Sequence, residues 1–176
     1  MKLSQRIAFC GVICALSIMV LLMTLFPFAT YALAALAGLF FIPVVLELNV
    51  RYGLACYAVT AALAFFITPE MEAKVLFILF FGYYPAVQLR LNLMRNTVAS
   101  WALKFLIFNV AVVGGYVLML TTIGLPPDSF TIGGVHLPYV FLAAGNVVFA
   151  VYDVAITRVT AMYRIRLHPM VKKLFK

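Results

Sequence analysis

Residues 7–28 read IAFCGVICALSIMVLLMTLFPF, and this stretch decides the class of fold. It has no charged residue over 22 positions. A helix rises about 1.5 Å per residue and the hydrocarbon core of a bilayer is about 30 Å thick, so the stretch is long enough to span a membrane. The apolar part of a secretory signal peptide has only about 7–15 residues, and we therefore expect this helix to stay in the mature protein.

Five more apolar runs follow, and the breaks between them carry charges, prolines and glycines. The six runs are 7–28, 31–48, 52–68, 73–89, 99–121 and 137–157. The fourth run is short, with Lys74 near its start and Pro85 near its end, which predicts a tilted, kinked or partly re-entrant helix. We expect an all-α integral membrane protein in which residues 1–176 form a single domain of six transmembrane helices.

The composition excludes a soluble domain. Apolar residues make up 66% of the chain and charged residues 10%, whereas soluble domains average about 45–50% and about 25%. The net charge of +8 comes from residues spread over several loops, so we expect the lipid bilayer, and not a nucleic acid, as the surroundings of this chain.

Lysine and arginine are distributed very unequally between the two sides of the predicted membrane domain. If the N-terminus is cytoplasmic, twelve of the 13 basic residues, Lys104 among them, fall on the inner side and only Lys74 on the outer. Cytoplasmic loops carry this excess in membrane proteins. We therefore expect a multi-pass protein of a bacterial cytoplasmic membrane, with both termini in the cytoplasm.

Polar side chains within the spans are the first candidates for a functional site, because they are costly at membrane depth. Asn109 and Tyr116 share a face of the fifth span, and Tyr139, Asn146 and Asp153 recur every seven residues in the sixth. Each stripe is expected to face the bundle interior. The alternative is that the asparagines are hydrogen-bonding links between helices and that the tyrosines only pack.

The fourth span adds Gly82-Tyr83-Tyr84-Pro85, where a missing backbone donor coincides with two phenols, so a kink there could open a pocket. Two acids lie near the predicted cytoplasmic ends of their spans. We expect Glu47 to pair locally with Arg51, and Asp153 with Arg158.

The first span begins with a strip of small residues, Ala8, Gly11 and Ala15, along which another helix could approach closely. The strip seats either a partner or a neighbouring helix of the same chain. Cys10 and Cys14, one turn apart, are expected to be small apolar fillers and not metal ligands. The chain has no nucleotide-binding G-x-x-x-x-G-K-[ST] loop, H-E-x-x-H or G-x-S-x-G motif, so we expect no catalytic residues, metal or cofactor.

In architecture the whole chain resembles the substrate-binding S component of energy-coupling factor (ECF) transporters, a type of ABC transporter. The resemblance rests on about 176 residues in six spans, cytoplasmic termini, the small-residue strip and the missing nucleotide site. It implies uptake of a vitamin or similar micronutrient captured from outside, together with a transmembrane coupling protein and two ATPase subunits.

The resemblance also implies where a ligand and the partner would bind. The family docks through an Ala-x-x-x-Ala pattern in its first helix, which Gly11 and Ala15, with Ala8 beside them, match loosely. In that family the outer halves of the later helices and the outer loops hold the substrate. The residues implied for substrate binding are Tyr83, Tyr84, Asn109, Tyr116, Tyr139 and Asn146.

Two other functions fit the same composition. A small membrane scaffold or assembly protein without a ligand would use its polar residues only to hold the helices together. A facilitator or channel would need a continuous polar path. A sealed outer pocket would indicate the S component, and a polar path through the membrane would indicate the channel. A structure with neither feature would indicate the scaffold.

Overall fold

The computed structural model describes residues 2–25, 29–123, 131–132 and 135–174. It confirms an all-α integral membrane protein with six helical segments long and apolar enough to span a bilayer. The segments overlap the six predicted runs: Leu3–Leu25, Thr30–Glu47, Val50–Ile67, Met71–Leu91, Thr97–Thr121 and Val140–Val171.

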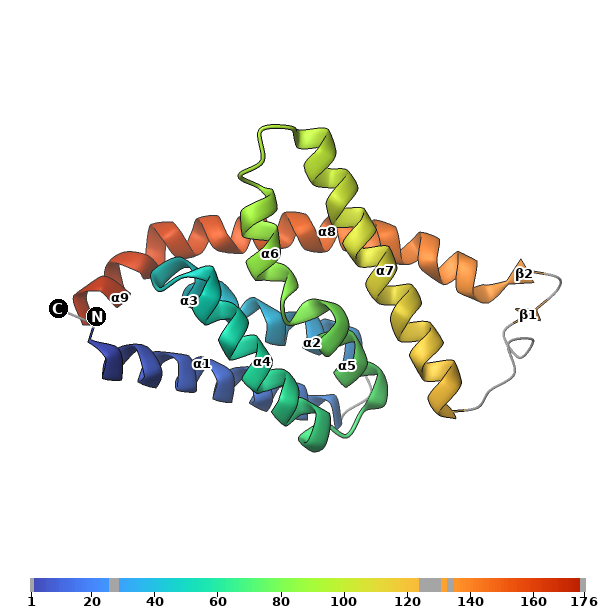
Figure 1. Ribbon diagram of the computed structural model, residues 1–176, viewed down its shortest axis with the longest axis horizontal. Coiled ribbons are helices and arrows are strands. Elements are labelled where there is room, and N and C mark those ends of the chain that lie inside the picture. The colour runs from blue at the N-terminus through green and yellow to red at the C-terminus, as the bar shows by residue number, and fades with distance from the viewer. Residues whose placement is uncertain (1, 26–28, 124–130, 133–134, 175–176) are drawn as a thin grey trace.

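Several of these segments are composite (Figure 1). The helical elements are α1 (Leu3–Leu22), η1 (Met23–Leu25), α2 (Thr30–Leu39), α3 (Phe41–Glu47), α4 (Val50–Ile67), α5 (Met71–Leu76), η2 (Phe77–Phe81), α6 (Tyr84–Leu91), α7 (Thr97–Ile123), α8 (Leu137–Met162), η4 (Tyr163–Leu167) and α9 (His168–Leu174). Between α7 and α8, β1 (Thr131–Ile132) pairs antiparallel with β2 (Val135–His136), Thr131 opposite His136.

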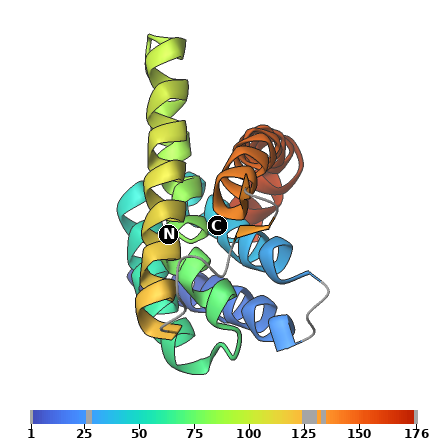
Figure 2. The ribbon, with the colours of Figure 1, turned by 90° about the vertical axis from the view of Figure 1, so that its right-hand side faces the viewer.

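The chain passes back and forth along the molecule, and the two termini lie together at one end (Figure 1). The described residues hold six candidate spans, an even number, which fits the expectation that both termini lie on one side of the membrane. Helix α7 crosses α8 steeply. In Figure 2, α8 is seen nearly end-on, whereas α7 is seen from the side. The fourth span, α5–η2–α6, packs between α2 on one side and α7 on the other.

The fourth span is broken, as its Gly82-Tyr83-Tyr84-Pro85 stretch predicts. Element η2 is a π-helical turn in which the Gly82 N–H donates to the Phe77 carbonyl at 2.9 Å, and α6 begins again at Tyr84 with Pro85 in its first turn. The widened turn leaves a carbonyl free, and the Tyr57 hydroxyl donates to Ile78 O at 2.5 Å. The backbone of the break is thus satisfied inside the protein, as it must be in a membrane.

A close backbone approach at Gly38 fixes α2 against η2. A Cβ at Gly38 would lie 2.0 Å from the carbonyl oxygen of Phe81, so no other residue fits there without movement. Acyl chains are as apolar as leucine, so burial in lipid adds little to helix association, and close packing of this kind contributes more.

Two hydrophobic clusters fill the interior. One extends over α1, α2, α3, α4, α5 and η2, with Leu21, Phe41 and Phe77 among its buried members. The other is aromatic and joins η2 and α6 to α7 and α8, with the Phe108 and Phe149 rings stacked at a centroid distance of 4.7 Å. The second cluster positions the polar residues described next.

Candidate functional site

A cavity of about 530 Å³ lies between the fourth span and α7. Ligand sites for small molecules usually measure about 300–1,000 Å³, so the volume suits one small molecule. The residues on α7 recur at helical spacing and therefore form one face of that helix. The lining consists of Leu79, Tyr83, Leu106, Ile107, Val110, Ala111, Gly114 and Leu118.

Tyr83 is the polar contribution to this lining. It follows the π-helical turn, and its ring meets the ring of Tyr57 edge-on at a centroid distance of 5.7 Å. Within the part of the chain that the structure describes, the Tyr83 hydroxyl has no hydrogen-bond partner. No described group therefore competes with a ligand for this hydroxyl.

The two consecutive tyrosines do not share a pocket. Tyr84 is fully buried, and its hydroxyl donates to Asp153 Oδ1 at 2.6 Å, away from the cavity. Its ring stacks on Phe80 at a centroid distance of 4.6 Å. Of the expected tyrosine pair, the structure brings only Tyr83 to the cavity, because neighbouring helical residues point about 100° apart.

Asn109 and Asn146 face each other between α7 and α8. Each side-chain amide donates to the oxygen of the other, at 2.9 and 3.1 Å, and each also donates to a backbone carbonyl one turn earlier in its own helix, Phe105 O and Leu142 O, both at 2.8 Å. These contacts use both donors of each amide. This is the arrangement expected of an interhelical link.

The remaining predicted substrate residues are Tyr116 and Tyr139. Tyr116 is half-buried on α7 and is not part of the cavity lining. Tyr139 falls in the first turn of α8, but its side chain lies outside the described part of the structure.

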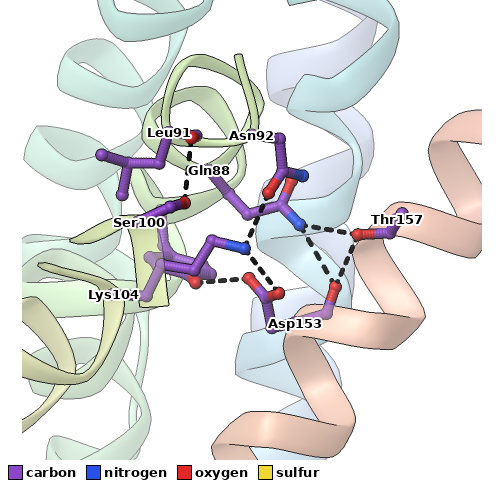
Figure 3. A network of polar contacts seen from close by, with 8 residues as sticks. Gln88, Leu91, Asn92, Ser100, Lys104, Asp153 and Thr157 are labelled. Atoms are coloured by element: carbon purple, nitrogen blue, oxygen red, sulfur yellow. Dashed lines mark hydrogen bonds and ion pairs between the residues drawn. The ribbon is translucent and has the colours of Figure 1, made fainter. Parts of the chain in front are cut away.

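Sequence reasoning missed a buried polar network that joins α6, α7 and α8 (Figure 3). Lys104 Nζ lies 2.8 Å from Asp153 Oδ2, and both side chains are only 3% exposed. Lys104 also donates to Asn92 Oδ1 at 2.7 Å and lies over the Trp101 ring, 4.7 Å from its centroid. With the Tyr84 hydroxyl on its other oxygen, the Asp153 carboxylate is well satisfied inside the protein.

Gln88 extends the network along α8. Its Nε2 donates to the Asp153 carbonyl at 3.2 Å and to Thr157 Oγ1 at 2.9 Å (Figure 3). Thr157 Oγ1 in turn donates to the same carbonyl at 3.0 Å. Gln88 is fully buried, and its Oε1 has no partner in the described part of the molecule.

This network corrects the expectation that Asp153 pairs with Arg158, and that Lys104 is simply one of the inner charges. A signal was present in the sequence. Lys104 lies five residues inside an apolar run, and Tyr84 and Gln88 repeat the one-turn spacing of Asp153 and Thr157. A buried charge needs a partner, and Asp153 is the acid of the sixth span.

The expected pairing of Glu47 with Arg51 is also wrong. Glu47 Oε1 lies 2.7 Å from His168 Nδ1 and accepts a hydrogen bond from the Tyr163 hydroxyl at 3.0 Å. No contact between Glu47 and Arg51 occurs among the residues that the structure describes. Glu47 thus fastens the C-terminal helical segment to the end of α3.

The small residues of α1 lie on its outer face. Ala8, Gly11 and Ala15 are exposed, and a Cβ at Gly11 would have no atom within 4 Å. The opposite face is buried, and there the Ser17 hydroxyl donates to the Ala37 carbonyl at 3.0 Å. Within the described residues, no other helix of this chain therefore packs against the strip.

The cysteines lie where α1 meets α4. The Cys14 thiol contacts the Cys56 carbonyl at 3.6 Å, and all three cysteines are free thiols. Across residues 2–25, 29–123 and 135–174, no group of three or more His, Cys, Asp or Glu side chains is arranged to hold a metal ion.

Together, the fold and the site define a multi-pass α-helical membrane protein that has an apolar cavity of small-molecule size and, separately, a buried ion pair. Comparisons with family models, with curated proteins and with solved structures find no match for the chain.

Proposed function

We propose that this protein is the substrate-binding subunit of a micronutrient uptake system, of the kind that the S components of ECF transporters represent. The observation that carries the proposal is the cavity between the fourth span and α7, which has the volume of a small-molecule site and includes Tyr83, whose hydroxyl has no partner among the described residues. The cavity is open along α7, where Leu106 and Val110 are exposed, and is not the sealed pocket expected from the sequence. The subunit captures its substrate without transforming it.

The proposed orientation puts both termini in the bacterial cytoplasm, following the excess of inner basic residues. Helix α7 then runs outward from Thr97, and the lining residues 106–118 belong to the middle and outer part of its span. A substrate in this cavity is nearer to the outer surface, as uptake from outside requires.

The proposed partners are a transmembrane coupling protein and two ATPase subunits, because the chain has no nucleotide-binding loop of its own. The exposed strip of Ala8, Gly11 and Ala15 supports docking through α1. Small side chains allow a partner helix to approach closely, and nothing in the described structure covers Gly11.

Affinity purification from the membranes of the organism that makes the protein tests this function. We expect the coupling protein and both ATPases to co-purify with the wild-type chain and to be lost with Gly11→Leu, which obstructs close approach. The matched control is Val12→Leu, since Val12 is also exposed, at 59%, but lies outside the strip. Equal recovery of the partners with both variants would contradict docking through the strip, and absence of ATPases from the wild-type complex would contradict the function.

A membrane scaffold without a ligand is the second candidate, and a specific observation favours it. The polar residues that could have formed a substrate site are largely paired with one another, Asn109 with Asn146 and Lys104 with Asp153. A scaffold would purify with an unrelated membrane protein and no ligand. A facilitator or channel is disfavoured, because the cavity lining is apolar and offers no polar path.

A further inference from the structure

The chemistry of the cavity lining restricts what it can hold. Seven of the eight lining residues are apolar and none is charged. The amides of Asn109 and Asn146 do not line it and are engaged with each other, as are the charges of Lys104 and Asp153. A ligand that carried a charge or several polar groups would leave them unpaired here, at a cost of roughly 1–3 kcal/mol for each group.

The cavity opens towards the bilayer. Leu106 and Val110 of its lining are 59% and 65% exposed, and both lie well inside the span Thr97–Thr121. At this depth an exposed side chain faces acyl chains and not water. A molecule can therefore reach the cavity sideways from the hydrocarbon core.

Two adjacent glycines shape this opening. A Cβ at Gly115 would lie 3.4 Å from the side chains of Leu79 and Val75, so α7 packs closely on the fourth span there. A Cβ at Gly114 would have no atom within 4 Å. Gly114 thus leaves open space beside a tight contact: a Cβ there would displace no neighbour, and a larger side chain would extend into the cavity that Gly114 lines.

We infer that the cavity binds an uncharged lipophilic small molecule with one hydroxyl or carbonyl group, which enters from the bilayer and hydrogen-bonds to the Tyr83 hydroxyl. This inference rests on the proposed function and names its substrate class. The lining has no basic side chain to hold a phosphate, so a phospholipid at this site would present only an acyl chain, which the test below distinguishes from the proposed ligand.

Photolabelling of the full chain in phosphatidylcholine nanodiscs tests the inference. The probe is hexadecanol carrying a diazirine, and cross-linked peptides are mapped by mass spectrometry. We expect labelling of residues 106–118 that saturates with probe concentration and falls at least about tenfold with excess unlabelled hexadecanol, as binding to a defined site requires. Labelling that rises without saturation, or that extra phosphatidylcholine displaces equally well, would show contact with bulk lipid and overturn the inference.

Variants locate the label. Gly114→Phe is expected to abolish the saturable labelling, while Val113→Phe keeps it, because Val113 is 47% exposed but not part of the lining. Val110→Phe is a second filling variant if Gly114→Phe does not fold, as size-exclusion chromatography would show. Tyr83→Phe should weaken probe affinity between about twofold and tenfold, the effect of one lost hydrogen bond. Saturable labelling that survives both filling variants would place the probe elsewhere and contradict the inference.

The substrate class and the function can fail separately. ATPase co-purification with no saturable labelling would leave the function standing and overturn the lipophilic substrate. Saturable labelling in a protein that never co-purifies with an ATPase would support the ligand and contradict the transport role.

Discussion

At the scale of single residues, the ion pair of Lys104 and Asp153 matters most, because both charges are almost completely shielded from the surroundings. A buried pair is satisfied only while both members are present. The pair is also held by Tyr84 and Asn92, at the start and just past the end of α6, so it links the fourth, fifth and sixth spans at one point.

Removing one charge of this pair should be strongly destabilising. We expect Lys104→Met to lower the free energy of unfolding in detergent by about 3–5 kcal/mol, because the Asp153 carboxylate stays buried without its counter-charge. The double variant Lys104→Gln/Asp153→Asn keeps hydrogen-bonding groups without charge and should recover much of the loss. Lys74→Met is the control, since Lys74 is only partly buried and makes one long hydrogen bond, to the Phe65 carbonyl at 3.5 Å, so its loss should change stability by no more than about 0.5 kcal/mol. A Lys104→Met loss no larger than that of the control would refute the buried pair.

The asparagine pair makes a prediction of its own. A double-mutant cycle with Asn109→Leu and Asn146→Leu should give a coupling energy of about 0.6 kcal/mol, and not more than about 1.7 kcal/mol, because the two amides exchange hydrogen bonds across the helices. Additive effects of the two substitutions on unfolding would mean that the amides do not interact.

At the scale of elements, the contact between α2 and η2 is the tightest backbone approach among the described glycines. It allows the irregular fourth span to pack although its helix is interrupted. The break itself has a local cause, because Pro85 has no N–H for the turn before it.

A matched pair of glycine variants tests this contact. Gly38→Ala should destabilise the protein by about 1–3 kcal/mol or more, since the new Cβ would meet the Phe81 carbonyl oxygen at 2.0 Å. Gly11→Ala, on an exposed helix face with open space, should be neutral or stabilising by up to about 1 kcal/mol. Thermal unfolding in the same detergent compares the two, and equal midpoints would argue against the close approach.

The sequence was sufficient to predict the elements but not their side-chain partners. Run lengths, charges and prolines predicted six spans and a broken fourth one, because these features are local along the chain. The partner of Lys104 lies 49 residues away, and no periodicity within one helix identifies it. For Asn109 and Asn146 the sequence left two alternatives, a hydrogen-bonding link between helices and a ligand site. The choice between them depends on which faces of α7 and α8 meet, and that is not local along the chain.

At the scale of the whole molecule, the orientation in the membrane remains a prediction that follows from the uneven distribution of basic residues. A green fluorescent protein fused after Lys176 should fluoresce, because it folds in the cytoplasm, whereas the same fusion after Glu70 should be dark. Alkaline phosphatase fusions at the two positions should give the opposite activities. The reverse result at both sites would mean that both termini lie outside the cytoplasm and that the cavity lies in the inner half of the membrane.

The central claim is that the cavity beside Tyr83 binds a small molecule in a protein that works with an energising module. Native mass spectrometry of the chain, gently solubilised from its own host's membranes, tests this most directly. The account predicts that wild-type protein retains a small uncharged molecule, and that Gly114→Phe loses it while keeping the ATPase subunits bound. A wild-type chain without any ligand, or the same ligand on Gly114→Phe, would contradict the account.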